Sequence, residues 1–498
     1  MAHARLNVGS FIPRRALAGV FRSVGQAARI PPMGLAVVVE KSGHGRTIAW
    51  TSSSSSPASS SASSSASSSA SSSLTPSYDA IIVGAGPAGM ATALALQRAG
   101  WSNILLMERR TREECMEGGT ALGLWTNAFC ALDALGVGEA VRQRCSRTTK
   151  VEICREANDR MLTSFDLTAC TGGPHEFGGV LRGALVGALY EAIDREVVDV
   201  RFGVQCASCV VSDSDSSNAS DSSNMVVTTA DGEALHARMV IGADGVNSVV
   251  ARAYGEGAGK DMSTNDVGQI AIRGIAEGKP VDDQPIRQVL GAGVRAGTYP
   301  VGQGTGELYW YVCYPSSEHD NSSDVLEEAR RVLLDSSGDW STSSILDAVG
   351  RTPATRASRN RLTDRWDVDA LFGGGSRGEE FGMGDKVTIA LAGDALHPMT
   401  PNLGQGGCCS IEDAVVLAAC LPGPSASGAE IRDAIAAYTL KRAKRCVKLT
   451  VRARVMGEIL QSGALPVVLA RDWFITNLFR AGGFLDHATY DVRDFLGG

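Results

Sequence analysis

The stretch that decides the fold reads DAIIVGAGPAG and spans residues 79–89. Its apolar start predicts a short, buried strand of a parallel sheet. The glycines that follow, Gly84, Gly86 and Gly89, form a Gly-x-Gly-x-x-Gly pattern, and a helical pattern and a second apolar run at 103–107 come next. Between a strand and a helix, such glycines permit a tight turn, the close approach of a pyrophosphate and close helix packing. The sequence therefore predicts a dinucleotide-binding unit.

An acidic residue, Glu108, stands at the end of the second apolar run. Its carboxylate can accept hydrogen bonds from both ribose hydroxyls of a dinucleotide, and it would repel a 2′-phosphate. The helix after Gly86 adds amide donors and a partial positive charge for the phosphates. These features favour FAD or NAD over NADP. The alternative, a glycine-rich turn without a ligand, is disfavoured by the strand and helix on either side.

Two further motifs each follow a predicted strand. RMVIGADGVNS at 238–248 places a Gly-Ala-Asp-Gly turn after its strand. KVTIALAGDALHP at 386–398 brings Asp394 to the end of another strand, where a carboxylate can bind the hydroxyls of a polyol. The next loop, PNLGQGG at 401–407, combines a rigid proline with three glycines, so its backbone amides can approach a flat ring.

A helix is expected at 411–420, where Ser410 and Asp413 resemble a capping box at its start. The positive end of this helix would face the loop at 401–407. Such an arrangement favours the negative charge of a reduced flavin. The second and third motifs therefore favour FAD over NAD.

In this order, the three motifs resemble the three fingerprints of the class A flavoprotein monooxygenases, which share the p-hydroxybenzoate hydroxylase fold. GDALHPMTPNLGQGGC at 393–408 and GTALGLWTNA at 119–128 look like the plant zeaxanthin epoxidase-like and urate hydroxylase-like group. The resemblance covers about residues 78–421. It implies an α/β fold: a Rossmann-type FAD-binding domain with an inserted mixed β-sheet substrate domain and C-terminal helices.

The resemblance also implies which residues bind the cofactor. The glycine motif and Glu108 would hold the ADP half of FAD, Arg182 would contact the flavin chain, and Asp394 the ribityl chain. The middle motif would serve the pyrophosphate and, indirectly, NAD(P)H. The full set implied to bind FAD is Gly84, Gly86, Gly89, Glu108, Arg109, Arg182, Asp244, Gly245, Asp394, Pro401, Gly404, Gln405, Gly406 and Gly407.

No catalytic side chain stands out in the sequence. Arg273, on a predicted strand at 269–274, is a candidate contact for an anionic substrate, with a surface charge as the alternative. His397 is expected to structure its loop rather than to catalyse.

The resemblance implies a monooxygenase that uses NAD(P)H and dioxygen to hydroxylate or epoxidise a small aromatic or unsaturated substrate through a flavin hydroperoxide. No second Gly-x-Gly-x-x-Gly follows a strand, so NAD(P)H is expected to dock transiently. Two alternatives stay open. One is another flavin-dependent oxidoreductase on the same fold, a reductase or a redox-neutral enzyme, and the other is a non-catalytic flavin-binding regulator.

The N-terminal segment at 1–77 differs in composition from the rest of the chain. It carries seven basic residues and one acidic residue, and 17 of the 22 residues at 52–73 are serine. An acid-poor, arginine-rich and serine-rich start is typical of an organelle transit peptide, and we expect the chloroplast, with the mitochondrion as the alternative. The serine tract predicts a disordered linker. A disordered terminus without a targeting role is the other interpretation.

The composition excludes several classes of protein. The chain has 498 residues, a net charge of −7 and 44% hydrophobic residues, enough for a sizeable core. No basic stripe indicates a nucleic-acid binder, and no run of 18 apolar residues predicts a membrane-spanning helix. The twelve cysteines are scattered, which is typical of a reduced compartment. No metal site is predicted.

The expected organisation is a leader followed by a discontinuous two-domain fold. Residues 451–482 mix apolar residues with arginines; packing on the FAD domain is favoured, and a helix on a membrane surface is the alternative. The predicted segments are 1–77 (transit peptide and linker), 78–256 (first part of the FAD-binding domain, with a disordered loop at 212–224), 257–384 (substrate domain), 385–421 (last part of the FAD-binding domain) and 422–498 (C-terminal helices).

Overall fold

The computed structural model describes residues 77–495 except 171–174, 212–224, 260, 279–283, 317–322, 337, 342 and 366–386. The predicted transit peptide and serine-rich linker lie outside the described residues, except for Ser77. The predicted loop at 212–224 also lies outside them.

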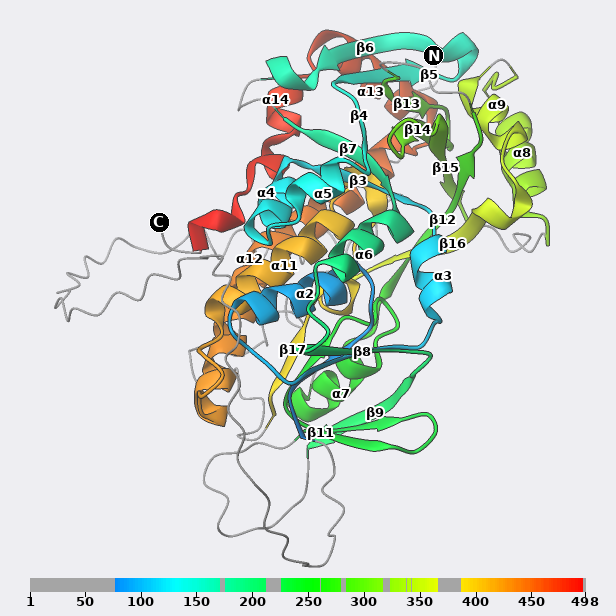
Figure 1. The fold of residues 1–498 in the computed structure, drawn as a ribbon. Coiled ribbons are helices and arrows are strands. Elements are labelled where there is room, and N and C mark those ends of the chain that lie inside the picture. Colours follow the sequence, from blue (N-terminus) through cyan, green and yellow to red (C-terminus); the bar gives the residue numbers. More distant parts are fainter. Residues whose placement is uncertain are drawn as a thin grey trace, which may run out of the picture. The chain divides into compact units, whose positions relative to one another are not determined.

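The first sheet carries the dinucleotide-binding unit, at the bottom of Figure 1. Its order is β8-β2-β1-β11-β10-β9, with β17 paired to the end of β11; β8, β2, β1, β11 and β17 run parallel. Parallel strands end at one edge, so the residues after β1, β2, β11 and β17 meet there. The strands are β1 (Ser77–Val83), β2 (Ile104–Glu108), β8 (Val198–Phe202), β9 (Cys206–Val211), β10 (Met225–Thr229), β11 (Ala234–Gly242) and β17 (Ile389–Leu391).

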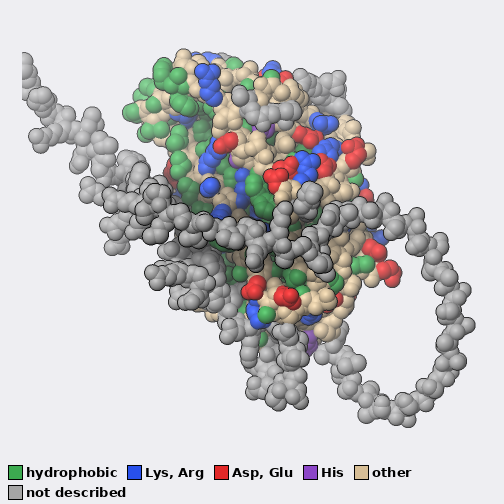
Figure 2. All heavy atoms as spheres, turned by 90° about the vertical axis from the view of Figure 1, so that its left-hand side faces the viewer, with side chains coloured by type: hydrophobic (Ala, Val, Ile, Leu, Met, Phe, Trp, Pro, Cys, Tyr) green, Lys and Arg blue, Asp and Glu red, His purple; other side chains and the backbone are tan. Residues whose placement is uncertain are grey.

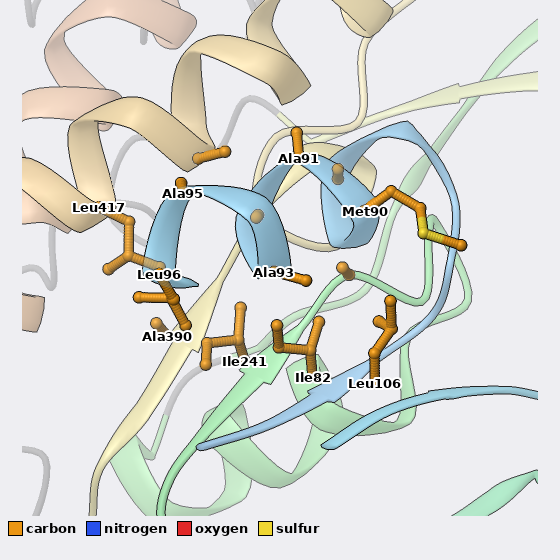
Figure 3. Close-up of a cluster of buried hydrophobic side chains, with 14 of the residues drawn as sticks. Ile82, Met90, Ala91, Ala93, Ala95, Leu96, Leu106, Ile241, Ala390 and Leu417 are labelled. Atoms are coloured by element: carbon orange, nitrogen blue, oxygen red, sulfur yellow. The ribbon is translucent and has the colours of Figure 1, made fainter. Parts of the chain in front are cut away.

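Helices α2 (Pro87–Arg98) and α11 (Gly406–Cys420) form the core above this sheet. In Figure 3, Ile82 and Ile241 point from the strands toward α2, and Ala95 on α2 points toward α11. Small residues on α2 allow it to lie close to both neighbours, and these side chains are almost completely buried. The remaining helices of this part are α3 (Arg112–Glu117), α4 (Thr126–Ala134), α5 (Gly138–Arg142), α6 (Arg182–Glu191) and α7 (Val249–Ala258).

The second sheet, at the top of Figure 1, has the order β16-β12-β15-β14-β13-β5-β6. Its pairs are antiparallel except for β13 and β5. Helices α8 (Val325–Asp335) and α9 (Ser344–Gly350) cover one face. The strands are β5 (Lys150–Arg155), β6 (Arg160–Asp166), β12 (Asn265–Ala276), β13 (Ile286–Leu290), β14 (Arg295–Val301), β15 (Glu307–Pro315) and β16 (Ala357–Asp364).

This sheet differs in one respect from the expected domain division. Strands β5 and β6 belong to the segment that was assigned to the FAD-binding domain, yet β5 pairs with β13 of the substrate domain and β6 pairs with β5. Pairing across more than 100 residues leaves no local signal in the sequence. A smaller three-stranded sheet lies between the two large ones in Figure 1 and consists of β3 (Ala121–Trp125), β4 (Ser146–Arg147) and β7 (Phe177–Leu181).

The C-terminal part is helical, as expected. Helix α12 (Gly428–Leu460) starts with a capping box in which Ser427 and Glu430 bond each other's backbone, and it packs against α11. Helices α13 (Leu465–Asn477) and α14 (Ala481–Phe484) follow. None of the helices within the described ranges is both long and apolar enough to cross a membrane. The predicted α/β class, with a Rossmann-type sheet, a mixed second sheet and C-terminal helices, is confirmed.

Candidate functional site

Two glycines of the glycine loop, the segment that joins β1 to α2, have no room for a side chain. Gly84 has a φ of 102°, and a Cβ there would lie 2.5 Å from the carbonyl oxygen of Ala243. A Cβ on Gly89 would lie 1.8 Å from the carbonyl oxygen of Gly84. Gly86 is the N-cap of α2 and supplies no side-chain cap, so the first amides of the helix stay open to a ligand. This geometry is the one that a bound pyrophosphate requires.

Glu108 lies beside this loop, at the end of β2. Its Oε2 accepts a hydrogen bond from the backbone N–H of Ala85 at 2.9 Å, and its Oε1 accepts one from Arg110 at 3.0 Å. A carboxylate offers about four lone-pair positions, so two remain for ribose hydroxyls. The acid therefore stands where the sequence predicted it.

Arg182 brings a positive charge to the loop from the start of α6. A Cβ on Gly86 would lie 3.2 Å from its Nη2. Its Nη1 is buried without a hydrogen-bond partner, and within the described residues it forms no ion pair. Burial, and then the charge of Arg110, lower the pKa of Arg182. The charge of Glu108 offsets this cost only in part, and the pyrophosphate of FAD would supply the missing charge.

Two of the predicted contacts are less direct. Arg109 follows β2 and is exposed. Asp244 accepts hydrogen bonds from the backbone N–H of Val249 at 2.7 Å and from the Ser248 hydroxyl, so its carboxylate caps α7. Gly245 has a φ of 83° and faces open space. The roles of these residues toward FAD or NAD(P)H stay predictions.

Asp394 follows β17, as predicted, and its carboxylate is free. Among the described residues, no hydrogen bond to this carboxylate is formed, and the side chain is accessible to solvent. The protein around it nevertheless desolvates the group and raises its pKa, against the opposing charges of His397 and Arg273. A side chain that is accessible yet surrounded by protein faces a space inside the fold. Asp394 therefore remains available for the hydroxyls of a ligand.

The loop at 401–407 leads directly into α11. Its first residues form a 3-10 turn, Gly404 has a φ of 63°, and Gln405 is the N-cap of a helix that begins at Gly406. A Cβ on Gly406 would lie 3.9 Å from an Asp394 carboxylate oxygen. The amino terminus of α11 is therefore part of the loop itself and borders Asp394.

The predicted start of this helix at 411 is wrong. Ser410 lies inside α11 and its hydroxyl donates to the carbonyl oxygen of Gly407 at 2.7 Å, as an interior serine does. Asp413 bonds residues outside the helix. The spacing of a capping box also occurs inside a helix, and only the tertiary partners of Asp413 distinguish the two cases.

Those partners form a fully buried cluster behind the loop. Asp413 Oδ2 accepts a hydrogen bond from the backbone N–H of Gly393 and lies 2.7 Å from His397 Nε2, and Oδ1 accepts one from Arg442 Nε at 2.5 Å. Burial alone would raise the pKa of Asp413, but the charges of His397 and Arg442 lower it to about 2. Burial would likewise lower the pKa of His397, and Asp413 raises it well above its usual value.

The cluster continues through an amide to the loop at 401–407, which we call the flavin-side loop. Arg442 Nη2 donates to Glu412 at 2.7 Å, and Asn127 Nδ2 donates to Glu412 at 2.6 Å and to Gln405 Oε1 at 2.9 Å. Asn127 of α4 and Arg442 of α12 are thus both connected, through Glu412 or directly, to the loop that was predicted to line the isoalloxazine. Sequence reasoning missed Asn127, Glu412 and Arg442. The one local signal was a pair of adjacent acids inside an otherwise apolar helix.

Arg273 lies on β12 and faces tyrosines of the neighbouring strands. Burial raises the pKa of Tyr299 and of Tyr309, and the Arg273 charge opposes both shifts, as it does for Asp394. The rings of Tyr299 and Tyr309 have centroids 4.6 Å apart. Among the described residues, Arg273 forms no hydrogen bond or ion pair. Its guanidinium is therefore available to a ligand, on a strand of the second sheet and near enough to Asp394 to affect its pKa. A residue that contacts the substrate would need both properties.

A cavity of about 620 Å³ opens beside the middle motif. It lies next to Gly245 and is lined by the turn at 246–248, by Arg252 on α7 and by Arg365. Arg365 donates to the carbonyl oxygens of Ala395 and Leu396, so it also ties this region to the third motif.

The comparisons with known proteins agree with this geometry. The sequence profile of the FAD binding domain family matches residues 77–373. The chain is 28% identical over 431 residues to "Monooxygenase 2" of Arabidopsis thaliana, covering 80% of this chain and 94% of the relative. It is 26% identical to "FAD-dependent urate hydroxylase" of Mycolicibacterium vanbaalenii over 386 residues, covering 75% and 86%.

A solved structure shares the fold. The Klebsiella pneumoniae HpxO protein complexed with FAD and uric acid superimposes with a TM-score of 0.65 at 21% identity, covering 84% of this chain and 96% of that chain. The glycine loop, the free charges of Arg182 and Asp394 and the family match all point to the same cofactor. The chain therefore belongs to the FAD binding domain family and, within it, to the class A FAD-dependent monooxygenases.

Proposed function

We propose that this oxidoreductase uses NAD(P)H and dioxygen to hydroxylate or epoxidise a small aromatic or unsaturated substrate. The observation that carries the proposal is a series of three charged groups without partners among the described residues: Arg182 at the glycine loop, Asp394 at the third motif and Arg273 on the second sheet. Charged groups without a partner inside a fold are unfavourable unless a ligand supplies the opposing charge or a hydrogen bond. Bound FAD would supply the redox chemistry that activates dioxygen.

The residues of the chain would bind and orient the cofactor. Arg182 and the start of α2 neutralise the pyrophosphate, Glu108 accepts from the adenosine ribose, and Asp394 accepts from the ribityl hydroxyls. The buried cluster around Asp413 fixes the loop at 401–407 against α12, so its amides are held in place before the cofactor binds.

The substrate side combines one cation with several aromatic rings. Arg273 would bind an anionic or phenolate group, and Tyr299 and Tyr309 would pack against a ring. The name of the Mycolicibacterium relative, a urate hydroxylase, describes an enzyme that acts on such a compound. We therefore propose an aromatic substrate with an acidic group.

The reductant would dock without a domain of its own. The cavity beside Gly245 supports this, because it lies next to the middle motif and has the exposed Arg252 on its wall. Among the described strands, β1 is the one followed by a Gly-x-Gly-x-x-Gly loop. We propose that NAD(P)H binds there transiently.

We also propose a chloroplast location, with the mitochondrion as the alternative, on the composition of residues 1–77. We further propose peripheral membrane contact through residues 451–482, because α13 carries exposed apolar side chains such as Leu465 and Trp473.

The test is oxygen consumption by the purified, FAD-loaded protein with NADH or NADPH. We expect consumption that rises when a phenolic acid such as 3-hydroxybenzoate or salicylate is added. In the Arg273→Met variant the stimulation by these acids should fall at least tenfold, while flavin content and consumption without substrate stay unchanged. A flavin-binding regulator or a redox-neutral enzyme would consume no oxygen, and equal stimulation in both proteins would remove Arg273 from the substrate site.

A further inference from the structure

Helix α13 carries an unusual number of exposed apolar side chains. Leu465, Leu469 and Trp473, spaced one turn apart, have 67%, 60% and 60% of their surface exposed. Single exposed apolar residues are ordinary, but a contiguous patch marks an interaction surface. We call the exposed apolar side chains of α13 and its C-terminal end its outer face; they are Leu465, Val467, Leu469, Trp473, Phe474 and Leu478. Figure 2 shows apolar side chains gathered at the upper left of the molecule.

The opposite face of α13 is fixed to the second sheet. Val468, Arg471 and Ile475 are buried, and Ile475 packs against Leu162 of β6 and Leu290 of β13. Arg471 Nη1 donates to the carbonyl oxygen of Leu460 at 2.7 Å. The helix is therefore anchored, and its outer face is presented to the surroundings on a rigid element.

The charges around this face suit an anionic surface. Residues 465–480 contain three charged side chains, of which Arg471 and Asp472 pair with each other beside the sheet. The third, Arg480, is exposed, and the neighbouring strand β6 carries one exposed base, Arg160, and one exposed acid, Asp166, so the basic residues are in excess. An apolar face with a tryptophan and basic residues at its margin has the composition of a helix that lies in a membrane interface.

A row of aromatic rings leads from this helix toward the flavin-side loop. It begins at Phe479, and the centroid distances between successive rings range from 4.6 to 6.4 Å. Burial lowers the pKa of His487 in this row to about 4, so its ring is neutral at neutral pH. The row runs through Phe479, Phe484, His487, Trp125, Phe177, Tyr299 and Tyr309.

Trp125 connects this row to the cofactor site. A Cβ on Gly404 would lie 3.2 Å from its Nε1, so the ring borders the loop predicted to line the isoalloxazine. Tyr309, at the end of the row, faces Arg273. These uncharged rings pack against one another and fill the space between the C-terminal end of α13 and the proposed substrate site.

We propose that the outer face of α13 docks on an anionic bilayer and that the enzyme takes from it an aromatic substrate with an apolar tail. The substrate part rests on the proposed monooxygenase function. The docking part does not, because a helix can bind a bilayer whether or not the enzyme turns over.

Docking is tested by flotation of the full-length, FAD-loaded protein with vesicles of phosphatidylcholine and phosphatidylglycerol. The test variant is Leu469→Gln/Trp473→Gln, since glutamine keeps the helix. The matched control is Val210→Gln/Leu334→Gln, which removes two side chains that are 54% and 55% exposed on β9 and α8. We expect the parent and the control to float and the test variant to stay at the bottom. Equal flotation of parent and test variant, or no flotation of the parent, would overturn docking.

A second copy of the chain is the competing occupant of this face. Light scattering of the parent without vesicles would then show a dimer that the Leu469→Gln/Trp473→Gln variant converts to a monomer, and this result would overturn the bilayer as the occupant. A monomeric parent that floats supports the proposal.

Delivery is tested by flavin fluorescence titration with 4-octylphenol in vesicles and with 4-ethylphenol in buffer. We expect the parent to bind 4-octylphenol at least tenfold more tightly than the Leu469→Gln/Trp473→Gln variant, and both proteins to bind 4-ethylphenol equally. Equal affinities for 4-octylphenol would overturn delivery from the bilayer. Because this measures binding and not turnover, a failure of the monooxygenase function would appear separately, in the oxygen-consumption experiment.

Discussion

Arg182 shows how one residue can indicate the charge of a ligand. Its guanidinium is partly buried at the glycine loop, its Nη1 has no hydrogen-bond partner among the described residues, and desolvation lowers its pKa. A sequence can predict an arginine at the start of a helix, but it cannot show whether the guanidinium has a hydrogen-bond partner in the folded protein. The unpaired nitrogen therefore adds to the motif a physical reason for FAD.

Replacing Arg182 by leucine should have opposite effects on FAD affinity and on the stability of the FAD-free protein. Affinity should fall by about 1.5–3 kcal/mol, the range for a hydrogen bond to a charged group. The FAD-free variant should be at least as stable as the parent, because an unpaired buried charge is removed. Flavin titration and thermal unfolding with and without FAD measure both. A variant destabilised without FAD would show that Arg182 has a structural role instead.

Replacing Asp394 by alanine removes a ligand contact and no core volume. We expect a loss of roughly 1–3 kcal/mol in FAD affinity with an unchanged fold. Glu108→Ala should lose a similar amount, but it also removes the acceptor for the Ala85 amide, so the FAD-free protein should lose stability as well. Flavin content and the thermal midpoint separate the two variants. If Asp394→Ala binds FAD like the parent, Asp394 is not a cofactor ligand.

At the scale of elements, α11 depends on α12. The two acids of α11, Glu412 and Asp413, are fully buried, and Arg442 of α12 bonds both. A buried ion pair contributes little net stability when intact, but removing Arg442 takes a counter-charge from two buried acids, which keep only Arg445 and His397 as charged partners.

The Arg442→Met variant should therefore be destabilised by about 3–5 kcal/mol in urea unfolding. The matched control is Arg361→Met, which removes a surface pair with Asp266 in which both side chains are more than half exposed. That variant should lose no more than about 0.5 kcal/mol. A comparable loss in the control would mean that arginine removal as such, and not the buried acids, causes the effect.

The His397 and Asp413 pair makes α11 sensitive to pH from both sides. The pKa of His397 is raised on folding, so its stabilisation is complete below the unfolded value of about 6.5 and is lost as the pH rises through the folded pKa. The pKa of Asp413 falls to about 2, so its stabilisation is lost as the pH drops from about 4 to 2. The difference in thermal midpoint between the parent and His397→Asn should therefore shrink above pH 6.5. A constant difference up to pH 9 would contradict the charged histidine.

At the scale of the whole molecule, the FAD site is assembled from segments far apart in the chain. The three motifs of the site, at 84–89, 242–245 and 393–407, all lie after Tyr78 in the sequence. A chain that begins at Ser77 should therefore fold and bind FAD with the same dissociation constant as the full chain. The flavin spectrum and a flavin titration test this. A colourless truncated protein would show that residues 1–76 take part in the fold.

The sequence by itself determined the dinucleotide unit, because each residue of the motif is required by structure that lies close to it in the sequence. Gly84 and Gly89 are required where backbone atoms approach closely, and Glu108 ends the adjacent strand. Strand, turn and helix lie within 30 residues, so pattern and structure coincide. The positions of Asp394 and the loop at 401–407 followed from the same local reasoning together with the family resemblance.

Only the tertiary structure decided what depends on distant partners. The pairing of β5 with β13 and the hydrogen bond from Asn127 to Glu412 join residues more than 100 positions apart. The role of Asp413 inside α11 depends on whether its side chain is buried or exposed. Local spacing carries no information about such contacts. The two faces of α13 make the same point: the sequence showed an apolar segment, and only packing against the second sheet determined which side chains remain exposed.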